Sequence, residues 1–147
     1  EMQQELLTDH TWVLYTDADE FVIPDPKKYT DLRDFMLKSD EKQTFCEGYE
    51  IFKKVGQSEV DYSTPIFKQR QSWWKDISGS YNKPALSQIP TKWVHGFHQI
   101  EGMESGEVKN IKNTGLYMIH LKHVDDDVLE DGIGDEEPIP EKIMEFL

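Results

Sequence analysis

The hydrophobic and polar positions of this chain predict helices near its start and mostly strands afterwards. Residues 1–8 (EMQQELLT) are typical of a helix whose apolar contacts are two adjacent leucines. A second helix is expected over residues 30–38, where apolar residues fall three and four apart, with Thr30 or Asp31 as its N-terminal cap. A short C-terminal helix is expected at residues 141–147, after two prolines.

The remaining hydrophobic runs favour strands. Residues 12–16 (WVLYT) form an unbroken run, which favours a strand buried on both faces of a parallel sheet. Segments 43–55 and 64–70 would form a hairpin around the polar turn 56–63, and residues 73–82 would be a loop. Further strands are expected at residues 83–89, 92–100 and 115–124. We therefore predict an α/β fold with a mixed sheet and an antiparallel C-terminal half, and we expect an N-terminal part of that fold outside these residues.

Composition and charge narrow the classes of partner. The chain has 147 residues and a net charge of −13, which argues against nucleic acid because phosphate backbones attract basic surfaces. Residues 125–137 hold eight of the acids and no Lys or Arg, which predicts an acidic linker after a domain over residues 1–124. No apolar run is long enough to predict a membrane-spanning segment. Cys46, the single cysteine, is expected to be a small buried hydrophobe, and it favours a reducing compartment such as the cytoplasm.

The chemistry-bearing feature is the stretch TDADEF, which places Asp17, Asp19 and Glu20 directly after the strand of residues 12–16. Ligand sites of open α/β sheets gather at the carboxyl ends of strands. Crowded carboxylates raise each other's pKa unless a cation neutralises them, and their oxygens suit Mn²⁺ or Mg²⁺. The alternative is an acidic turn or helix cap without a ligand. A calcium loop of the EF-hand type is excluded, because its glycine position would be Val22.

Several motifs, in order along the chain, resemble one enzyme family. They are WVLYTDADEFVIP (12–24), FKQR (67–70) with nearby Trp73, YNKPAL (81–86), WVHGFHQI (93–100) and YMIHLKHVD (117–125). Together they resemble the family 2-type branch of the GT-A glycosyltransferases. The resemblance implies a partial GT-A, Rossmann-like fold that lacks most of its nucleotide-binding N-terminal half.

The resemblance also implies an activity and a metal site. The activity is metal-dependent, inverting transfer of a sugar from a nucleotide-sugar donor, a UDP-sugar first, to a glycan or another hydroxyl acceptor. Asp17 and Asp19 would bind Mn²⁺ or Mg²⁺ and approach the donor, with Asp19 preferred as direct ligand. His120 would complete the metal site from a distant strand. Lys83 is a further candidate for the donor phosphates.

The five histidines form two pairs whose members are three residues apart. Such residues point to opposite faces of a strand, so at most one of each pair should face the site unless a bulge intervenes. The resemblance favours His120 and His98, whereas His95 and His123 are expected to be structural. His98 has an equally open structural alternative, and His10 is expected at the surface.

Sugar transfer with inversion needs a carboxylate to accept the proton of the acceptor hydroxyl. Asp76 is the first candidate, and Glu47 and Glu50 are alternatives. Each of the three could instead be a surface acid. Aromatic rings suit sugar faces, so Trp73, Trp74 and Tyr81 are candidate acceptor contacts, with core packing as the alternative.

Two other functions stay open at this stage. A metal-dependent nucleotidyl- or phosphotransferase also places acids at a strand end, but the glycine-rich phosphate loop that it needs does not occur here. A non-catalytic carbohydrate-binding or interaction domain would fit the tryptophan-rich segment and the incomplete nucleotide half.

Overall fold

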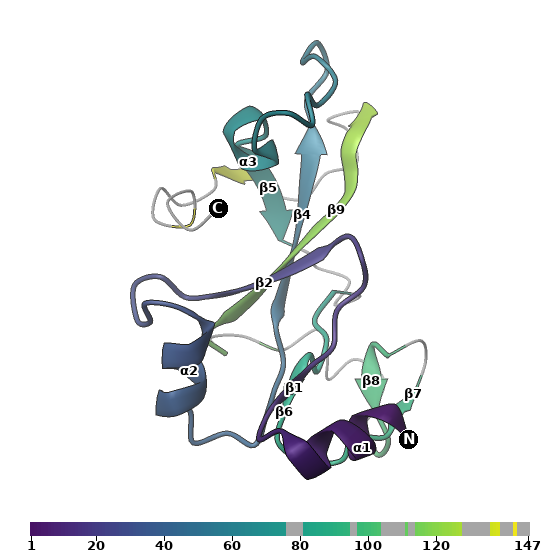
Figure 1. Ribbon diagram of the computed structural model, residues 1–147. Helices are drawn as coiled ribbons and strands as arrows, with labels where there is room; N and C mark the ends of the chain where they lie inside the picture. The colour runs from purple at the N-terminus through teal and green to yellow at the C-terminus, as the bar shows by residue number, and fades with distance from the viewer. Residues whose placement is uncertain are drawn as a thin grey trace.

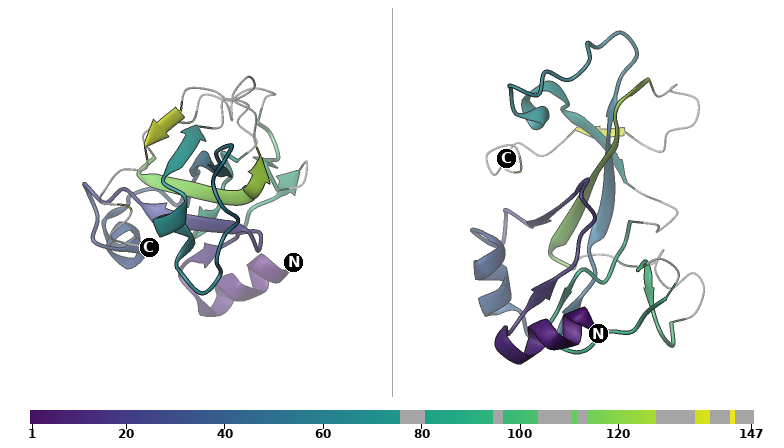
Figure 2. Two further views of the ribbon diagram at one scale, coloured as in Figure 1. Left: turned by 90° about the horizontal axis from the view of Figure 1, so that it is seen from above. Right: turned by 45° about the vertical axis from the view of Figure 1, so that its right-hand side comes forward.

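The computed structural model describes residues 1–75, 81–94, 97–103, 111, 114–127, 136–138 and 143. These residues form a mixed α/β structure with several sheets, more strands than helices, and an elongated outline (Figures 1 and 2). α1 and two small sheets lie at one end, and the main sheet extends from there to the other end (Figure 1).

The main sheet has a parallel pair at its centre. β4 (Glu47–Lys53) and β9 (Leu116–Asp127) pair in parallel; Tyr49, Ile51 and Phe52 favour the first strand, and the apolar start of the second, LYMI, favours its burial in the sheet. The three other strands, β2 (Glu20–Pro24), β5 (Ser72–Lys75) and β10 (Glu136–Pro138), add antiparallel in the order β10-β5-β4-β9-β2. The central strands β4 and β9 are therefore each covered by a neighbour on both edges.

Two small sheets lie beside α1. One joins β1 (Val13–Leu14), β6 (Leu86–Ser87) and β3 (Gln43–Thr44), with β6 in the middle and both pairings antiparallel. The other is a hairpin of β7 (Trp93–Val94) and β8 (Gln99–Ile100). These short strands attach the N-terminal segment to the middle of the chain.

Among the described residues, the helices α1, α2 and α3 flank the sheets. α1 spans Met2–Asp9, α2 spans Leu32–Lys38 and α3 spans Ile66–Gln69. The side chain of Asp31 accepts a hydrogen bond of 2.7 Å from the backbone N–H of Asp34, which fixes the start of α2. No helix in the described part of the chain is long and apolar enough to cross a membrane.

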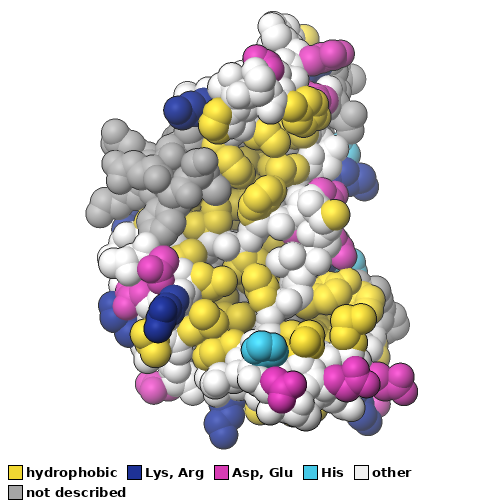
Figure 3. All heavy atoms as spheres, in the orientation of Figure 1, with side chains coloured by type: hydrophobic (Ala, Val, Ile, Leu, Met, Phe, Trp, Pro, Cys, Tyr) yellow, Lys and Arg dark blue, Asp and Glu magenta, His cyan; other side chains and the backbone are white. Residues whose placement is uncertain are grey.

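The buried apolar residues form two clusters. The larger lies between β4, β5, β9 and α3, and includes Ile51, Phe67, Trp73 and Ile119. The smaller contains Phe35, Cys46, Leu86, Leu116 and Met118. On the face shown in Figure 1, apolar side chains also reach the surface over much of the sheet (Figure 3).

Three sequence-based predictions were wrong. The run of residues 12–16 contains a two-residue strand that is antiparallel and partly exposed, not a parallel strand buried on both faces. Residues 64–70 were expected as a strand but contain the short helix α3, which starts after Pro65. The first residues of the expected loop 73–82 belong to β5, so the hairpin partner of β4 is β5.

Other predictions agree with the structure. The helix over residues 30–38, the strand over 115–124 and the buried Cys46 are confirmed, with Asp31 as the cap. β9 continues beyond residue 124, and residues 136–138 pair with β5, so part of the expected linker belongs to the main sheet. Of the expected helix 141–147, only Ile143 lies among the described residues.

Candidate active site

The acidic stretch forms a tight turn that leads from β1 into β2, at the right of Figure 1. The backbone N–H of Asp17 donates to Oε2 of Glu20 at 2.9 Å, and the N–H of Glu20 donates to the carbonyl of Asp17 at 3.2 Å. The N–H of Leu121 donates to the carbonyl of Asp19 at 3.0 Å and ties the turn to β9. The turn therefore presents the carboxylates of Asp17 and Asp19 at the surface, where the side chain of each is 49% exposed.

The ammonium group of Lys83 neutralises part of the negative charge on the inner side of this turn. Its side chain is 2% exposed, and its Nζ lies 2.7 Å from Oδ2 of Asp17 and 2.6 Å from Oε1 of Glu20. The segment 81–85 that carries Lys83 is bonded on both sides, since Tyr15 N–H donates to the Ala85 carbonyl and Cys46 N–H donates to the Lys83 carbonyl. Lys83 is thus a buried counter-ion of the acids and is not free to meet a phosphate, contrary to its predicted role.

His120 approaches the same turn from β9. Its Nε2 lies 3.2 Å from Oδ2 of Asp19, and its Nδ1 lies 2.6 Å from Oε2 of Glu50, a fully buried residue of β4. The antiparallel register pairs Glu20 with His120, and the parallel register pairs Glu50 with His120. The sheet itself therefore brings acids from two other strands to this histidine.

Tyr81 holds the ring of His120 from one side. The two rings stack with centroids 4.3 Å apart and an interplanar angle of 30°. Gly48 makes room for this stack, since a Cβ there would lie 2.5 Å from Cβ of Tyr81. The N–H of Gly48 also donates to Oδ1 of Asn82 at 2.7 Å, which fixes the segment that carries Tyr81.

Negative charge dominates the site. Among the described residues, four carboxylates contact one ammonium and one imidazole, so the acids outnumber the cations whether or not His120 is protonated. The hydrogen bond from Lys83 lowers the pKa of Asp17, and the charge of His98 contributes further. Burial opposes the charged form of His120, but the hydrogen bond and charge of Glu50 prevail and raise its pKa. Burial and the hydrogen bond to Asp17 raise the pKa of Tyr15.

The residues present fit part of a metal site. Among the described residues, no three His, Cys, Asp or Glu side chains are arranged to hold a metal ion. Asp19 and His120 do supply a carboxylate oxygen and an imidazole nitrogen that lie 3.2 Å apart. Such ions often take their remaining ligands from water and substrate phosphate, and an imidazole suits Mn²⁺ better than Mg²⁺. Asp17 faces Lys83, so Asp19 is the better placed of the two aspartates.

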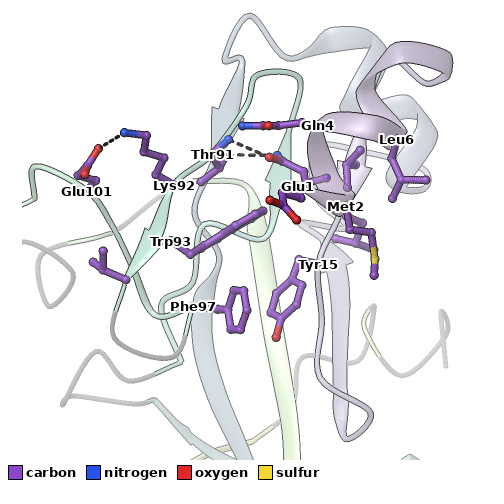
Figure 4. Close-up of a pocket in the computed structure, with 14 residues that line it drawn as sticks. Glu1, Met2, Gln4, Leu6, Tyr15, Thr91, Lys92, Trp93, Phe97 and Glu101 are labelled. Atoms are coloured by element: carbon purple, nitrogen blue, oxygen red, sulfur yellow. Dashed lines mark hydrogen bonds and ion pairs between the residues drawn. The ribbon is translucent and has the colours of Figure 1, made fainter.

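An aromatic cavity of about 690 Å³ adjoins this site. Its wall includes Trp93 and Phe97, and the rings of Tyr15 and Phe97 stack with centroids 4.6 Å apart (Figure 4). The hydroxyl of Tyr15 points away from α1, and it donates to Oδ1 of Asp17 at 3.1 Å. One side chain thus belongs both to the cavity and to the acidic turn.

Two of the three predicted acceptor aromatics lie elsewhere. Trp73 is buried in the core, where it stacks on Tyr49 at 4.4 Å, so its predicted contact with a sugar is wrong. Trp74, also on β5, packs on Phe52 of β4 with ring centroids 4.7 Å apart. Tyr81 is the one of the three that reaches the site, through its stack on His120.

The three candidate bases differ in where they lie. Glu47 is buried and pairs with Lys75 at 2.7 Å, and Glu50 is buried behind His120. Neither carboxylate faces the solvent, which contradicts a role in accepting a proton from an acceptor hydroxyl. Asp76 lies outside the described residues.

The histidine pairs follow the expected alternation in part. His123 stacks near Trp74, with centroids 6.3 Å apart, whereas His120 faces the acids. His98 lies close enough to Asp17 to affect its pKa. His10 is exposed, as expected, and His95 lies outside the described residues.

Comparison with models of protein families, with curated protein sequences and with solved structures found no significant match to this chain.

Three features of the site were not predicted from the sequence. They are the counter-ion role of Lys83, the second role of Tyr15 and the close approach at Gly48. The signal for Lys83 was a single cation in the apolar stretch YNKPAL, close to no other charge in sequence.

Proposed function

We propose that this chain carries the metal-binding part of a glycosyltransferase that uses a nucleotide-sugar donor, a UDP-sugar first. The observation that carries the proposal is the approach of Asp19 and His120, 3.2 Å apart, from different strands. Their two donor types suit Mn²⁺, and the surplus of carboxylates suits a divalent cation. We also assign the α/β arrangement to part of a GT-A fold on the strength of the motif order in the sequence.

The residues would divide the work of transfer between them. The bond between the sugar's anomeric carbon and the diphosphate oxygen breaks, and the acceptor oxygen forms the new bond and loses its proton to a carboxylate base. A bound Mn²⁺ would offset the charge of the leaving diphosphate. Asp19 and His120 would hold the ion, and Lys83 would keep Asp17 ionised and the turn in place. Asp76 stays the predicted base.

The aromatic cavity supports a nucleotide-sugar ligand in particular. Tyr15 joins the cavity to the acidic turn, so a ligand could place a planar ring against Trp93 and Phe97 and its phosphates beside Asp19. A volume of about 690 Å³ is within the range of small-molecule sites. We assign the nucleoside of the donor to this cavity.

Calorimetric titration tests the proposal. UDP should bind in the presence of Mn²⁺ and lose at least tenfold in affinity when Mn²⁺ is replaced by a chelator, because the diphosphate would then meet only acids. Trp93→Ala should weaken UDP binding while leaving Mn²⁺ binding intact. A wild-type chain that binds no Mn²⁺ would refute the proposal.

The second candidate function is carbohydrate binding without catalysis, and the same aromatic cavity favours it. Aromatic faces bind sugar rings without any need for a metal. If oligosaccharides bind with equal affinity with and without Mn²⁺, and UDP does not bind, this second function replaces the first.

A further inference from the structure

The buried carboxylate of Glu50 is the least expected group in the site. It is 0% exposed and lies between two nitrogen atoms of β9. Nδ1 of His120 lies 2.6 Å from its Oε2, and the backbone N–H of His123 donates to its Oε1 at 3.2 Å. The backbone N–H of His123 is a donor by nature, and an ionised carboxylate at Glu50 pairs with Nδ1 of His120 only when that nitrogen also carries a hydrogen.

A break in the strand register creates this double contact. Along β4 and β9, Glu50 pairs with His120, but Phe52 pairs with His123, so β9 contains one extra residue between these pairs. The irregularity brings the N–H of His123 to the same carboxylate that meets the ring of His120. The strand geometry therefore directs one buried acid to one histidine.

The contact decides which nitrogen of His120 can bind a cation. With the proton held on Nδ1 by Glu50, Nε2 of neutral His120 presents a lone pair toward Asp19. In the other tautomer Nε2 would carry the hydrogen and donate it to Asp19, which would leave no lone pair for a metal. Metal-binding histidines are commonly oriented by such a second carboxylate.

We propose that Glu50 is a positioning residue, which holds His120 in the Nδ1–H form and so keeps Nε2 as the metal ligand beside Asp19. This inference rests on the proposed metal site. It also replaces the catalytic role predicted for Glu50, because the carboxylate acts through His120 and does not touch substrate.

An amide in place of the carboxylate distinguishes this role from simple packing. Glu50→Gln keeps the shape of the side chain but has one acceptor oxygen and one NH₂ group. If its oxygen accepts from the N–H of His123, its NH₂ faces Nδ1 and favours the tautomer with hydrogen on Nε2. If its oxygen faces Nδ1 instead, two donors meet at His123. The variant therefore cannot satisfy both contacts as Glu50 does.

The first measurement is Mn²⁺ affinity of the full chain by calorimetry. Glu50→Gln should weaken Mn²⁺ binding about tenfold or more, as loss of a supporting carboxylate commonly does. The matched control is Asp25→Asn, which also removes a buried carboxylate that accepts a backbone N–H, here from Lys27 at 2.9 Å, but at the other end of β2. The control should bind Mn²⁺ like the wild type.

A double-mutant cycle tests whether Glu50 acts through His120. His120→Ala should weaken Mn²⁺ binding, and adding Glu50→Gln to it should cause no further loss, because the group that Glu50 positions is gone. Equal losses with and without His120 would overturn the proposal, as would unchanged affinity in Glu50→Gln.

Nitrogen-15 spectra of the histidine rings test the tautomer of His120 in the metal-free wild type. This measurement therefore does not depend on whether a variant folds. The metal-free wild type at a pH where His120 is neutral should show its hydrogen on Nδ1. Hydrogen mainly on Nε2 would overturn the role of Glu50 whatever the metal results are. If the wild type shows the Nδ1–H form but binds no Mn²⁺, the proposed function fails and the metal part of this inference fails with it, while the control of the tautomer by Glu50 stands.

Discussion

In the described part of the chain, one ion-paired network surrounds the buried cation Arg70 and another surrounds the buried cation Lys83, and they differ in how completely their charged groups are paired. Arg70 donates to the carbonyls of Val124 and Ser58 at 2.7 Å each and to Asp125 at 3.2 Å, and Asp125 also accepts from Val60 N–H. We call this the closed network. The open network is the acidic turn with Lys83, Glu50 and His120, where negative charge prevails and half-exposed carboxylates face outward.

The two networks differ in whether their charges are balanced within the protein. In the closed network Asp125 accepts from Val60 and Tyr62 in the loop between β4 and α3, and from Arg70 directly after α3, so both of its oxygens have partners within the protein. In the open network the protein retains acids that repel each other, a cost that persists only where something else relieves it. The four predictions below challenge this contrast, in order of decreasing effect.

Removing the cation of the closed network should have the largest effect. Arg70→Met leaves the buried carbonyl of Val124, the less buried carbonyl of Ser58 and the carboxylate of Asp125 without their donor, which should lower the free energy of unfolding by about 3 kcal/mol. Urea unfolding measures the change. The control is Lys68→Met on the exposed side of α3, which should have almost no effect. A similar stability for both variants would show that the closed network is not structural.

Filling the space at Gly48 should break the open network through packing alone. A Cβ there would lie 2.5 Å from Cβ of Tyr81 and 2.8 Å from its backbone carbonyl carbon, so the backbone of segment 81–85 must move. We expect Gly48→Ala to cost about 2 kcal/mol, typical of overpacking. Thermal unfolding gives the cost, and proton chemical shifts of the His120 ring should change as Tyr81 leaves its face. An unchanged ring signal would contradict the proposed stacking support.

Removing one exposed acid from each network should separate binding from stability. Asp19→Asn removes a charge from a crowded group, so we expect Mn²⁺ affinity to fall at least tenfold, or about 1.4 kcal/mol, with stability unchanged or slightly higher. The matched control is Asp125→Asn, whose carboxylate is 33% exposed and contacts the buried cation Arg70, whereas that of Asp19 contacts His120. It should leave Mn²⁺ binding unchanged. Calorimetry measures the Mn²⁺ affinity of both variants, and thermal unfolding measures their stability. If Asp125→Asn weakened Mn²⁺ binding and Asp19→Asn did not, the roles assigned to the two networks would be exchanged.

The sequence was informative where local interactions decide the structure. The helix over residues 30–38 has both its cap and its apolar spacing within ten residues, and it forms as expected. The run WVLYT misled because an unbroken apolar segment does not say which neighbour will cover it, and here a short antiparallel partner does. Segment 64–70 is too short for its pattern to separate helix from strand, and Pro65 starts a helix.

The part of the site that could be predicted from the sequence consists of residues that lie within the quoted motifs. Asp19 and His120 were expected together and lie in contact. The burial of Glu50 and Lys83 could not be predicted, because it follows from the pairing of β4 with β9 and from the position of segment 81–85 between β1 and β4. The burial of Trp73 could not be predicted either. Its side chain is of a type that contacts sugars, but its position on β5 directs it into the core.

The smallest expected effect is a pH dependence that belongs to the closed network. The hydrogen bond from Val60 N–H, followed by that from the Tyr62 hydroxyl, lowers the pKa of Asp125 in the folded chain. A lowered folded pKa stabilises the protein above the unfolded value of about 4, and this contribution is lost as pH falls through the folded pKa. The stability difference between wild type and Asp125→Asn should therefore shrink as pH falls below about 4. Urea unfolding at several pH values measures it, with Asp40→Asn, an exposed acid between α2 and β3, as control. A constant difference across this range would show that Asp125 contributes through shape and not through charge, and the contrast between the two networks would then rest on hydrogen bonds alone.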